Sequence, residues 1–234
     1  MNPLIEAEGN SFRTFTFFTF VVLIILGLVV SVFSSKYRVS IINYDTELNL
    51  NYEELRKIEN SSIWLINDNN FEKFYLDNKS VEKLEISKQL PNVINITINL
   101  YEKIIVYTDF RDSSPRQRVL YKNLYVDDKI PEKELAHLVI TNGPIEDGFY
   151  SEIVSFILTV EKYNVDLSKL SITFDGNAVV INYLDTVIDA GKAVDLSRKG
   201  SVVGYVLEKN DCNGRIAIFD GASEDIETLF KCDN

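Results

Sequence analysis

The sequence predicts an α+β protein with a single N-terminal transmembrane helix and two soluble lobes. Two observations support this fold class. An uncharged, strongly apolar run extends from Thr14 to Ser35. After it, runs of alternating apolar and polar residues, typical of strands, are interrupted by amphipathic segments, typical of helices. About two hundred residues follow the run, which is enough for one medium domain or two small ones.

The apolar run 14–35 is long enough to cross a bilayer. Leu23 and Gly27 lie in its apolar middle, and its polar side chains are Thr and Ser hydroxyls, which can bond to carbonyls of their own helix. At about 1.5 Å per residue the run forms a helix of about 33 Å, against a hydrocarbon core of about 30 Å. We therefore expect a transmembrane helix at 14–35, preceded by a cytoplasmic tail at 1–13.

A cleaved signal peptide is the alternative interpretation of this run. The run is longer than the usual apolar region of about 7–15 residues in a signal peptide, and the preceding tail contains Glu6 and Glu8 beside Arg13 instead of a cluster of cations. Charge indicates the orientation only weakly. Lys36 and Arg38 follow the run and Arg13 alone precedes it, so an excess of one cation favours a cytoplasmic C-terminal part.

The charge balance is acidic. The chain has 24 Lys and Arg against 35 Asp and Glu; without Arg13, Glu6 and Glu8 the balance is 23 against 33. A nucleic-acid backbone or an anionic lipid surface would be repelled by this charge, so we expect no nucleic-acid partner and favour a protein partner. A role in solubility alone is the simpler alternative.

No set of residues suggests an active site. His137 is the only histidine and lies in an apolar run, where a structural role is favoured over general-base catalysis. The pairs Asp127–Asp128 and Glu224–Asp225 are interpreted as solvated turn residues, and no Gly-rich loop that could bind phosphate follows a strand. We expect no catalytic residue, cofactor, metal or small-molecule substrate.

The two cysteines, Cys212 and Cys232, lie near the C-terminus. They are too few for a structural zinc site, which needs about four ligands. In an exported domain they could form a disulfide; two free thiols are the alternative.

The first lobe is expected at 36–108. Its pattern is a strand, a short helix, a second helix, a strand, a Pro-Asn turn and a clearly alternating strand. The corresponding ranges are 37–43, 51–58, 71–76, 81–87, 91–92 and 93–103.

This order resembles the POTRA domain of the FtsQ/DivIB bacterial cell-division proteins, which follows their single transmembrane helix. The resemblance rests above all on residues 90–103, in which a Pro-Asn turn leads into an alternating strand that ends in Glu102-Lys103. It implies that this lobe recruits other membrane-bound division proteins.

The second lobe is expected at 109–220, after a polar joint at Asp109–Arg118. We expect a mixed sheet covered by two helices, at 149–163 and 196–209, the second weakened by Gly200 and Gly204. The strands are predicted at 119–127, 137–140, 170–174, 178–183, 187–189 and 215–220. Residues 221–234 form a C-terminal tail that either binds a partner or makes a short helix on the sheet.

This second pattern is similar to the extracytoplasmic β domain of FtsQ/DivIB. The resemblance implies a non-enzymatic membrane scaffold of the divisome, located in the cytoplasmic membrane at the septum with its lobes outside. It implies partners similar to FtsB/FtsL (DivIC/FtsL), which add at the terminal strand region. The expected partner-binding residues are Ile216, Ile218, Phe219, Ile226 and Leu229. A membrane-anchored envelope enzyme or a secretion-system adaptor is the alternative.

Overall fold

The computed structural model describes residues 3–44, 50–128, 134–209, 213–220 and 226–232, without the side chains of 3–14, 219 and 220. The chain divides into two compact units between Leu100 and Tyr101. Helix α1 is described separately below, and "the first unit" then means the part that follows it, residues 35–100. The joint expected at Asp109–Arg118 therefore lies inside the second unit.

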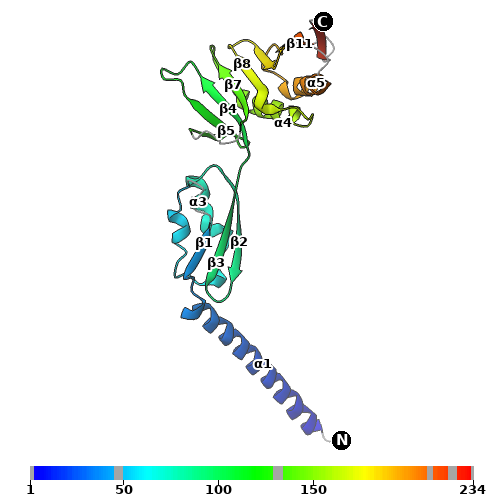
Figure 1. Cartoon of the computed structure of the whole chain (residues 1–234). Coiled ribbons are helices and arrows are strands. Elements are labelled where there is room, and N and C mark those ends of the chain that lie inside the picture. The colour runs from blue at the N-terminus through cyan, green and yellow to red at the C-terminus, as the bar shows by residue number, and fades with distance from the viewer. Residues whose placement is uncertain (1–2, 45–49, 129–133, 210–212, 221–225, 233–234) are drawn as a thin grey trace. The chain divides into compact units, whose positions relative to one another are not determined.

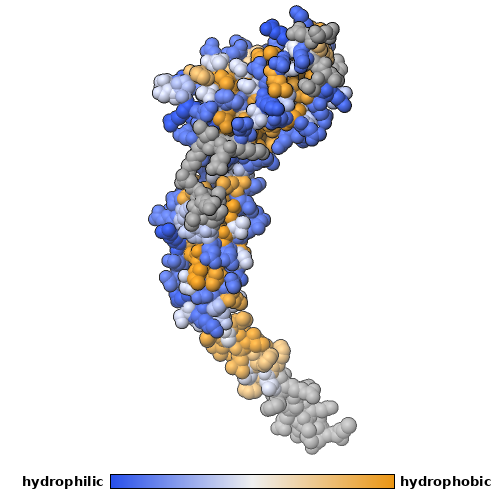
Figure 2. All heavy atoms as spheres, viewed as in Figure 1, coloured by the Kyte–Doolittle hydropathy of each residue, from blue (hydrophilic) through white to orange (hydrophobic). Residues whose placement is uncertain are grey.

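Helix α1 (Pro3–Phe33) begins the chain. Its segment Phe15–Phe33 is apolar and long enough to cross a membrane, and none of it is buried in the protein. Figure 2 shows this segment as a continuous hydrophobic surface. The helix ends two residues before the expected Ser35, because the Ser34 hydroxyl accepts a bond from the Lys36 amide and caps the 3₁₀ helix η1 (Ser35–Tyr37).

The first unit contains a three-stranded sheet and two short helices (Figure 1). Strand β1 runs parallel to β3, and β3 runs antiparallel to β2, which gives the order β1-β3-β2. Two 3₁₀ helices, η2 and η3, precede α3. The bounds are β1 (Ile41–Tyr44), α2 (Glu53–Arg56), η2 (Ile63–Leu65), η3 (Asp68–Phe71), α3 (Glu72–Asp77), β2 (Val81–Gln89) and β3 (Val93–Leu100).

Apolar side chains from the helices and the sheet form the core of this unit. Leu55 of α2 and Phe74 of α3 are fully buried with Ile94 of β3. Glu54, which is also buried, accepts bonds from Lys57 at 2.7 Å and Lys73 at 2.6 Å, so it joins α2 to α3.

The second unit is built on nine described strands in the order β12-β11-β10-β9-β8-β7-β4-β5-β6. Parallel pairs join β4 to β7, β7 to β8 and β10 to β11, and the other neighbours are antiparallel. The bounds are β4 (Lys103–Asp109), β5 (Gln117–Tyr121), β6 (Val126–Asp127), β7 (Ala136–Ile140), β8 (Leu170–Phe174), β9 (Val179–Tyr183), β10 (Thr186–Asp189), β11 (Gly214–Asp220) and β12 (Ile226–Cys232).

Helices α4 (Phe149–Val160) and α5 (Leu196–Lys209) lie side by side on one face of this sheet (Figure 1). Their apolar side chains share one core with the strand residues that point toward them, such as Leu138 and Ile172. The helices approach closely at Gly200, where an added Cβ would lie 3.1 Å from the Phe156 carbonyl oxygen. Gly200 therefore weakens the isolated helix but permits this packing.

Three of the expected strands differ from the structure. Strand β4 was not expected, and the strand predicted at 93–103 ends at Leu100. The strand predicted at 119–127 is divided between β5 and β6, because Leu124 has a positive φ of 67° and turns the chain. Residues 35–37 form η1, so the strand expected from Tyr37 begins at Ile41.

Candidate partner-binding edge

Strand β12 forms one edge of the nine-stranded sheet and has seven residues, whereas β6 at the other edge has two. Among the strands that the structure describes, β12 pairs with β11 alone. Half of its backbone N–H and C=O groups therefore point away from the sheet. A long edge of this kind can accept a further strand.

The register of β11 and β12 assigns the side chains of the edge to two faces. Leu229 lies opposite Ala217, and Phe230 lies opposite Ile216. Ile216 belongs to the core beneath the helices, so Phe230 is on the helix-covered face and Leu229 is on the open face. The edge thus offers one large apolar side chain on each face.

Two of the five expected partner-binding residues belong to the core. Ile216 is 1% and Ile218 is 2% exposed, so their side chains cannot reach a partner. The edge lies one strand later than expected, because β12 covers β11. Ile226 is partly buried against the core, and Phe219 lies opposite Glu227, its side chain being outside the described part.

Leu229 is the expected residue that the structure exposes most, at 64%. Phe230 beside it is 49% exposed and was not among the expected residues. Ile226, Leu229 and Phe230 are spaced as on a helix, which hid the strand. The preceding turn-rich sequence Gly221–Asp225 and the following cysteine were the available signs of a hairpin.

The C-terminal end of this edge is positive on the open face, whereas Glu227 places a negative charge nearer its other end on the same face. Arg215 of β11 and Lys231 of β12 are directly opposite each other, and both are exposed. Within the described residues, neither forms an ion pair. Two like charges at opposed positions destabilise a strand pair, so an acidic side chain from a third strand would be favourable here.

The last residue of β12, Cys232, is disulfide-bonded. It lies opposite Gly214, the first residue of β11. Cys212 is the only other cysteine of the sequence and lies outside the described residues. The bond attaches the C-terminal end of the edge strand to the protein, which limits fraying of β12.

His137 lies on the sheet face opposite the helices. Its Nε2 atom is 3.0 Å from the Thr108 hydroxyl, and burial lowers its pKa. Asp128 lies 3.3 Å from Arg116 in an exposed ion pair. Glu224 and Asp225 lie outside the described residues. No group of three or more potential metal ligands occurs in the parts of the chain that the structure describes.

A pocket of about 470 Å³ lies between the start of α4, the β8–β9 turn and the segment before α5. Glu146, Asp147 and Lys192 line it with Glu152. The Glu152 carboxylate accepts a bond of 2.8 Å from the Leu196 amide, so it caps α5. This pocket has acidic groups but, among its described lining residues, no histidine or cysteine.

The fold and the edge together define a class of protein: an α+β chain with one apolar helix long enough to span a bilayer and a C-terminal strand open to strand addition. No family model matches the sequence, and no curated protein matches it.

Proposed function

We propose that this protein is a single-pass membrane scaffold of the bacterial divisome, similar to FtsQ/DivIB. It links septal division proteins through its two units and thereby controls septal wall synthesis, without catalysing a reaction. The support is the order of parts along the chain: an apolar helix, a small α+β unit, and a larger sheet with two helices on one face.

The topology of the first unit supports a POTRA assignment. Its order is strand, helix, helix, strand, strand, and its first strand pairs in parallel with the last. A recruitment module of this kind offers surfaces next to the membrane to other membrane-bound division proteins.

The observation that carries the proposal is the edge strand β12. It combines unpaired backbone groups, exposed Leu229 and Phe230, and the Arg215–Lys231 pair of like charges. The partner that fits it is an extended segment with apolar residues on both faces and an acidic residue on the open face. Membrane proteins similar to FtsB/FtsL (DivIC/FtsL) are the proposed source of this segment.

The proposed location is the cytoplasmic membrane at the septum, with the N-terminus in the cytoplasm and both units outside. The disulfide at Cys232 supports the external location, because disulfides persist in oxidising compartments. Long domains can cross the membrane despite nearby positive charges such as Lys36.

The first test is capture of division proteins by the tagged full chain from crosslinked membranes. Leu229→Lys introduces a charge beside Arg215 and Lys231, so we expect it to reduce the capture of FtsB/FtsL-like proteins. Leu184→Lys is the matched control, since Leu184 is 62% exposed in the same unit but lies in the turn between β9 and β10, neither of which pairs with β12. Capture of secretion proteins instead, or equal loss with both variants, contradicts the proposal.

The second test is imaging of a tagged copy in dividing cells. The proposal predicts bands at midcell that form before constriction. Uniform membrane staining throughout the cycle contradicts a role in the divisome.

A further inference from the structure

The segment that leaves α1 fixes one end of the first unit close to the membrane. Tyr37 follows Phe33, the last residue of α1, by four residues. A chain of four residues spans at most about 14 Å. Tyr37 therefore lies within that distance of the end of the apolar helix, whatever angle the helix makes with the unit.

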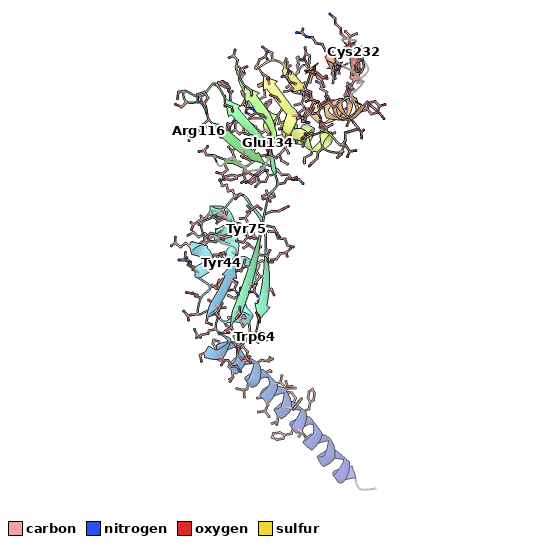
Figure 3. The ribbon with its side chains drawn as sticks, viewed as in Figure 1. Tyr44, Trp64, Tyr75, Arg116, Glu134 and Cys232 are labelled. Atoms are coloured by element: carbon pink, nitrogen blue, oxygen red, sulfur yellow. The ribbon has the colours of Figure 1, made fainter. Side chains whose placement is uncertain are left out.

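Trp64 is held against this segment. Its ring lies 5.6 Å from the ring of Tyr37, measured between centroids. The backbone strengthens the connection, because Arg38 forms a β-bridge with Ser62 and the Val39 amide donates to the Ser61 carbonyl at 2.9 Å. Figure 3 shows Trp64 at the end of the first unit where α1 joins it. The η2 turn thus stays with the juxtamembrane segment.

The apolar residues of η2, together with Ile66, which follows it, point in two directions, two into the core and two toward the solvent. Ile63 is fully buried and Ile66 is 3% exposed, whereas Trp64 is 43% and Leu65 is 60% exposed. The turn is therefore anchored in the core by the inner pair, and it presents the outer pair to its surroundings.

The β2–β3 hairpin adds another exposed apolar residue at the same end. Leu90 in its turn is 52% exposed. The parallel pairing of Ile41 with Val93 and the 3.0 Å bond from the Ser40 amide to the Asn92 carbonyl bring this turn beside the chain that leaves α1. Trp64, Leu65 and Leu90 form what we call the proximal apolar surface.

Although the chain as a whole is acidic, three cations lie near this surface, and such a local group of cations suits a lipid interface. Lys36 lies 6.0 Å from the centre of the Tyr37 ring, and the Arg38 guanidinium donates to the Asn60 carbonyl at 3.0 Å. Lys88 donates to the Ile66 carbonyl at 2.6 Å. Trp and Tyr favour the headgroup region of a bilayer, and Lys and Arg beside them can reach lipid phosphates.

We propose that the proximal apolar surface sits in the headgroup region of the same bilayer that α1 crosses, with Trp64 as its main contact. The occupant is lipid, because the surface is tethered within reach of the bilayer by its own chain and combines aromatic, apolar and cationic side chains. This contact holds the first unit against the membrane and restricts its rotation about the short segment 34–38. The inference rests on the membrane-spanning part of the proposed function.

The sole tryptophan of the chain makes a direct test possible, because intrinsic tryptophan fluorescence reports Trp64 alone. The full chain is reconstituted in vesicles of phosphatidylcholine and phosphatidylglycerol. Some vesicles contain lipids brominated near the glycerol backbone, and others contain lipids brominated near the chain ends. We expect the shallow bromines to quench Trp64 more strongly than the deep ones, and we expect the bilayer to shield it from aqueous iodide.

Two single-tryptophan variants serve as depth controls. Trp64→Phe combined with Leu23→Trp places the reporter in the middle of α1, where deep bromines should quench it. Trp64→Phe combined with Leu184→Trp places it on the second unit, where iodide alone should quench it.

Quenching of Trp64 by iodide and not by either brominated lipid would overturn the inference. If the Leu23→Trp reporter is still quenched by deep bromines in that case, α1 spans the bilayer and the proposed anchoring stands. If neither reporter senses bromine, the anchoring fails as well. Shielding of Trp64 from iodide without lipid quenching would indicate a second protein chain on this surface and would equally overturn the inference.

Discussion

Gly204 of α5 lies directly against the ring of Tyr163, which follows α4. A Cβ at residue 204 would lie 2.8 Å from Cγ of that ring, so the whole ring would have to move. The packing of α5 against the end of α4 therefore requires a residue without a side chain at position 204.

Gly204→Ala is expected to destabilise the second unit by up to about 2 kcal/mol. Overpacking a core typically costs about 1–3 kcal/mol, and the helix propensity of alanine offsets about 1 kcal/mol of it. Ser201→Ala, on the same helix, supplies the propensity effect without the contact at Tyr163. Urea unfolding of the detergent-solubilised chain, followed by tyrosine circular dichroism, measures the difference. Equal stability of the two variants would show that the ring can move freely.

Asn78, the residue after α3, joins the end of that helix to the segment before α2 through side-chain hydrogen bonds. Its side chain accepts a bond of 2.7 Å from the Asn51 amide and donates to the carbonyls of Asn51 and Phe74, each at 3.0 Å. Asn78→Ala should cost about 2–3 kcal/mol, because it leaves partly buried backbone groups without partners. Fluorescence of Trp64, which lies in the same unit, follows the unfolding. Asn78→Asp retains the acceptor but turns a carboxylate oxygen toward the Asn51 and Phe74 carbonyls, so it should lose at least as much stability as the alanine variant. An alanine variant as stable as the wild type would rule out this role.

Asp109 and Arg111 form a pH-sensitive ion pair at the end of β4. The guanidinium donates to both carboxylate oxygens and to the Gly143 carbonyl, and Arg111 lowers the pKa of Asp109. A lowered pKa in the folded state stabilises the fold above the unfolded pKa of about 3.9. This stabilisation is lost as the pH falls through the lower, folded pKa.

Arg111→Gln should therefore reduce stability at neutral pH by about 1.5–3 kcal/mol, the range for hydrogen bonds to charged groups. The difference from the wild type should shrink in strong acid. Thermal unfolding followed by circular dichroism from neutral to acidic pH measures it. Arg116→Gln removes an exposed pair with Asp128 and should change stability by less than about 1 kcal/mol. A pH-independent difference would refute the ionic origin.

Reduction of the disulfide at Cys232 should loosen the edge strand more than the rest of the sheet. The bond holds the end of β12 beside the start of β11, and the exposed residues of β12 contribute little packing. Hydrogen exchange before and after reduction is the measurement, with the buried strand β8 as internal reference. We expect faster exchange at 226–232 and no change at 170–174. Uniform acceleration would mean that the bond stabilises the whole unit.

The sequence predicted the strongly periodic elements well. The bounds of β8 and α5 agree with the prediction, and α4 ends three residues early. In these elements apolar residues recur with one period over several turns or strand repeats, so local pattern and tertiary packing agree.

Strand β4 was missed because it is buried on both faces. Ile104, Ile105 and Val106 are consecutive buried residues. Ile104 and Ile105 belong to the core beneath the helices, and Val106 belongs to the smaller cluster around Val119. Such a strand lacks alternation, so it could not be distinguished from a link between lobes. Its omission also moved the expected domain boundary from Leu100 to residue 108.

The candidate site was only partly predictable. Leu229 was predicted as a partner-binding residue and is exposed, whereas Ile216 and Ile218, predicted with it, are core residues. The sequence did not reveal that β12 pairs with β11, so it did not show which of these residues are covered. A pairing partner is a property of the folded sheet, and a single residue of slip would exchange the two faces. The role of Gly204 could not be predicted from local sequence patterns either, since it depends on a contact with Tyr163, about forty residues earlier in the chain.

The parallel pairing of β1 with β3 has a consequence for biosynthesis. Ile41 finds its partner Val93 about fifty residues later, and β2 attaches only through β3. The first sheet therefore cannot close until the ribosome has added most of the first hundred residues. By then α1 has emerged from the ribosome, so its entry into a membrane, which its length and composition permit, would come before this sheet folds.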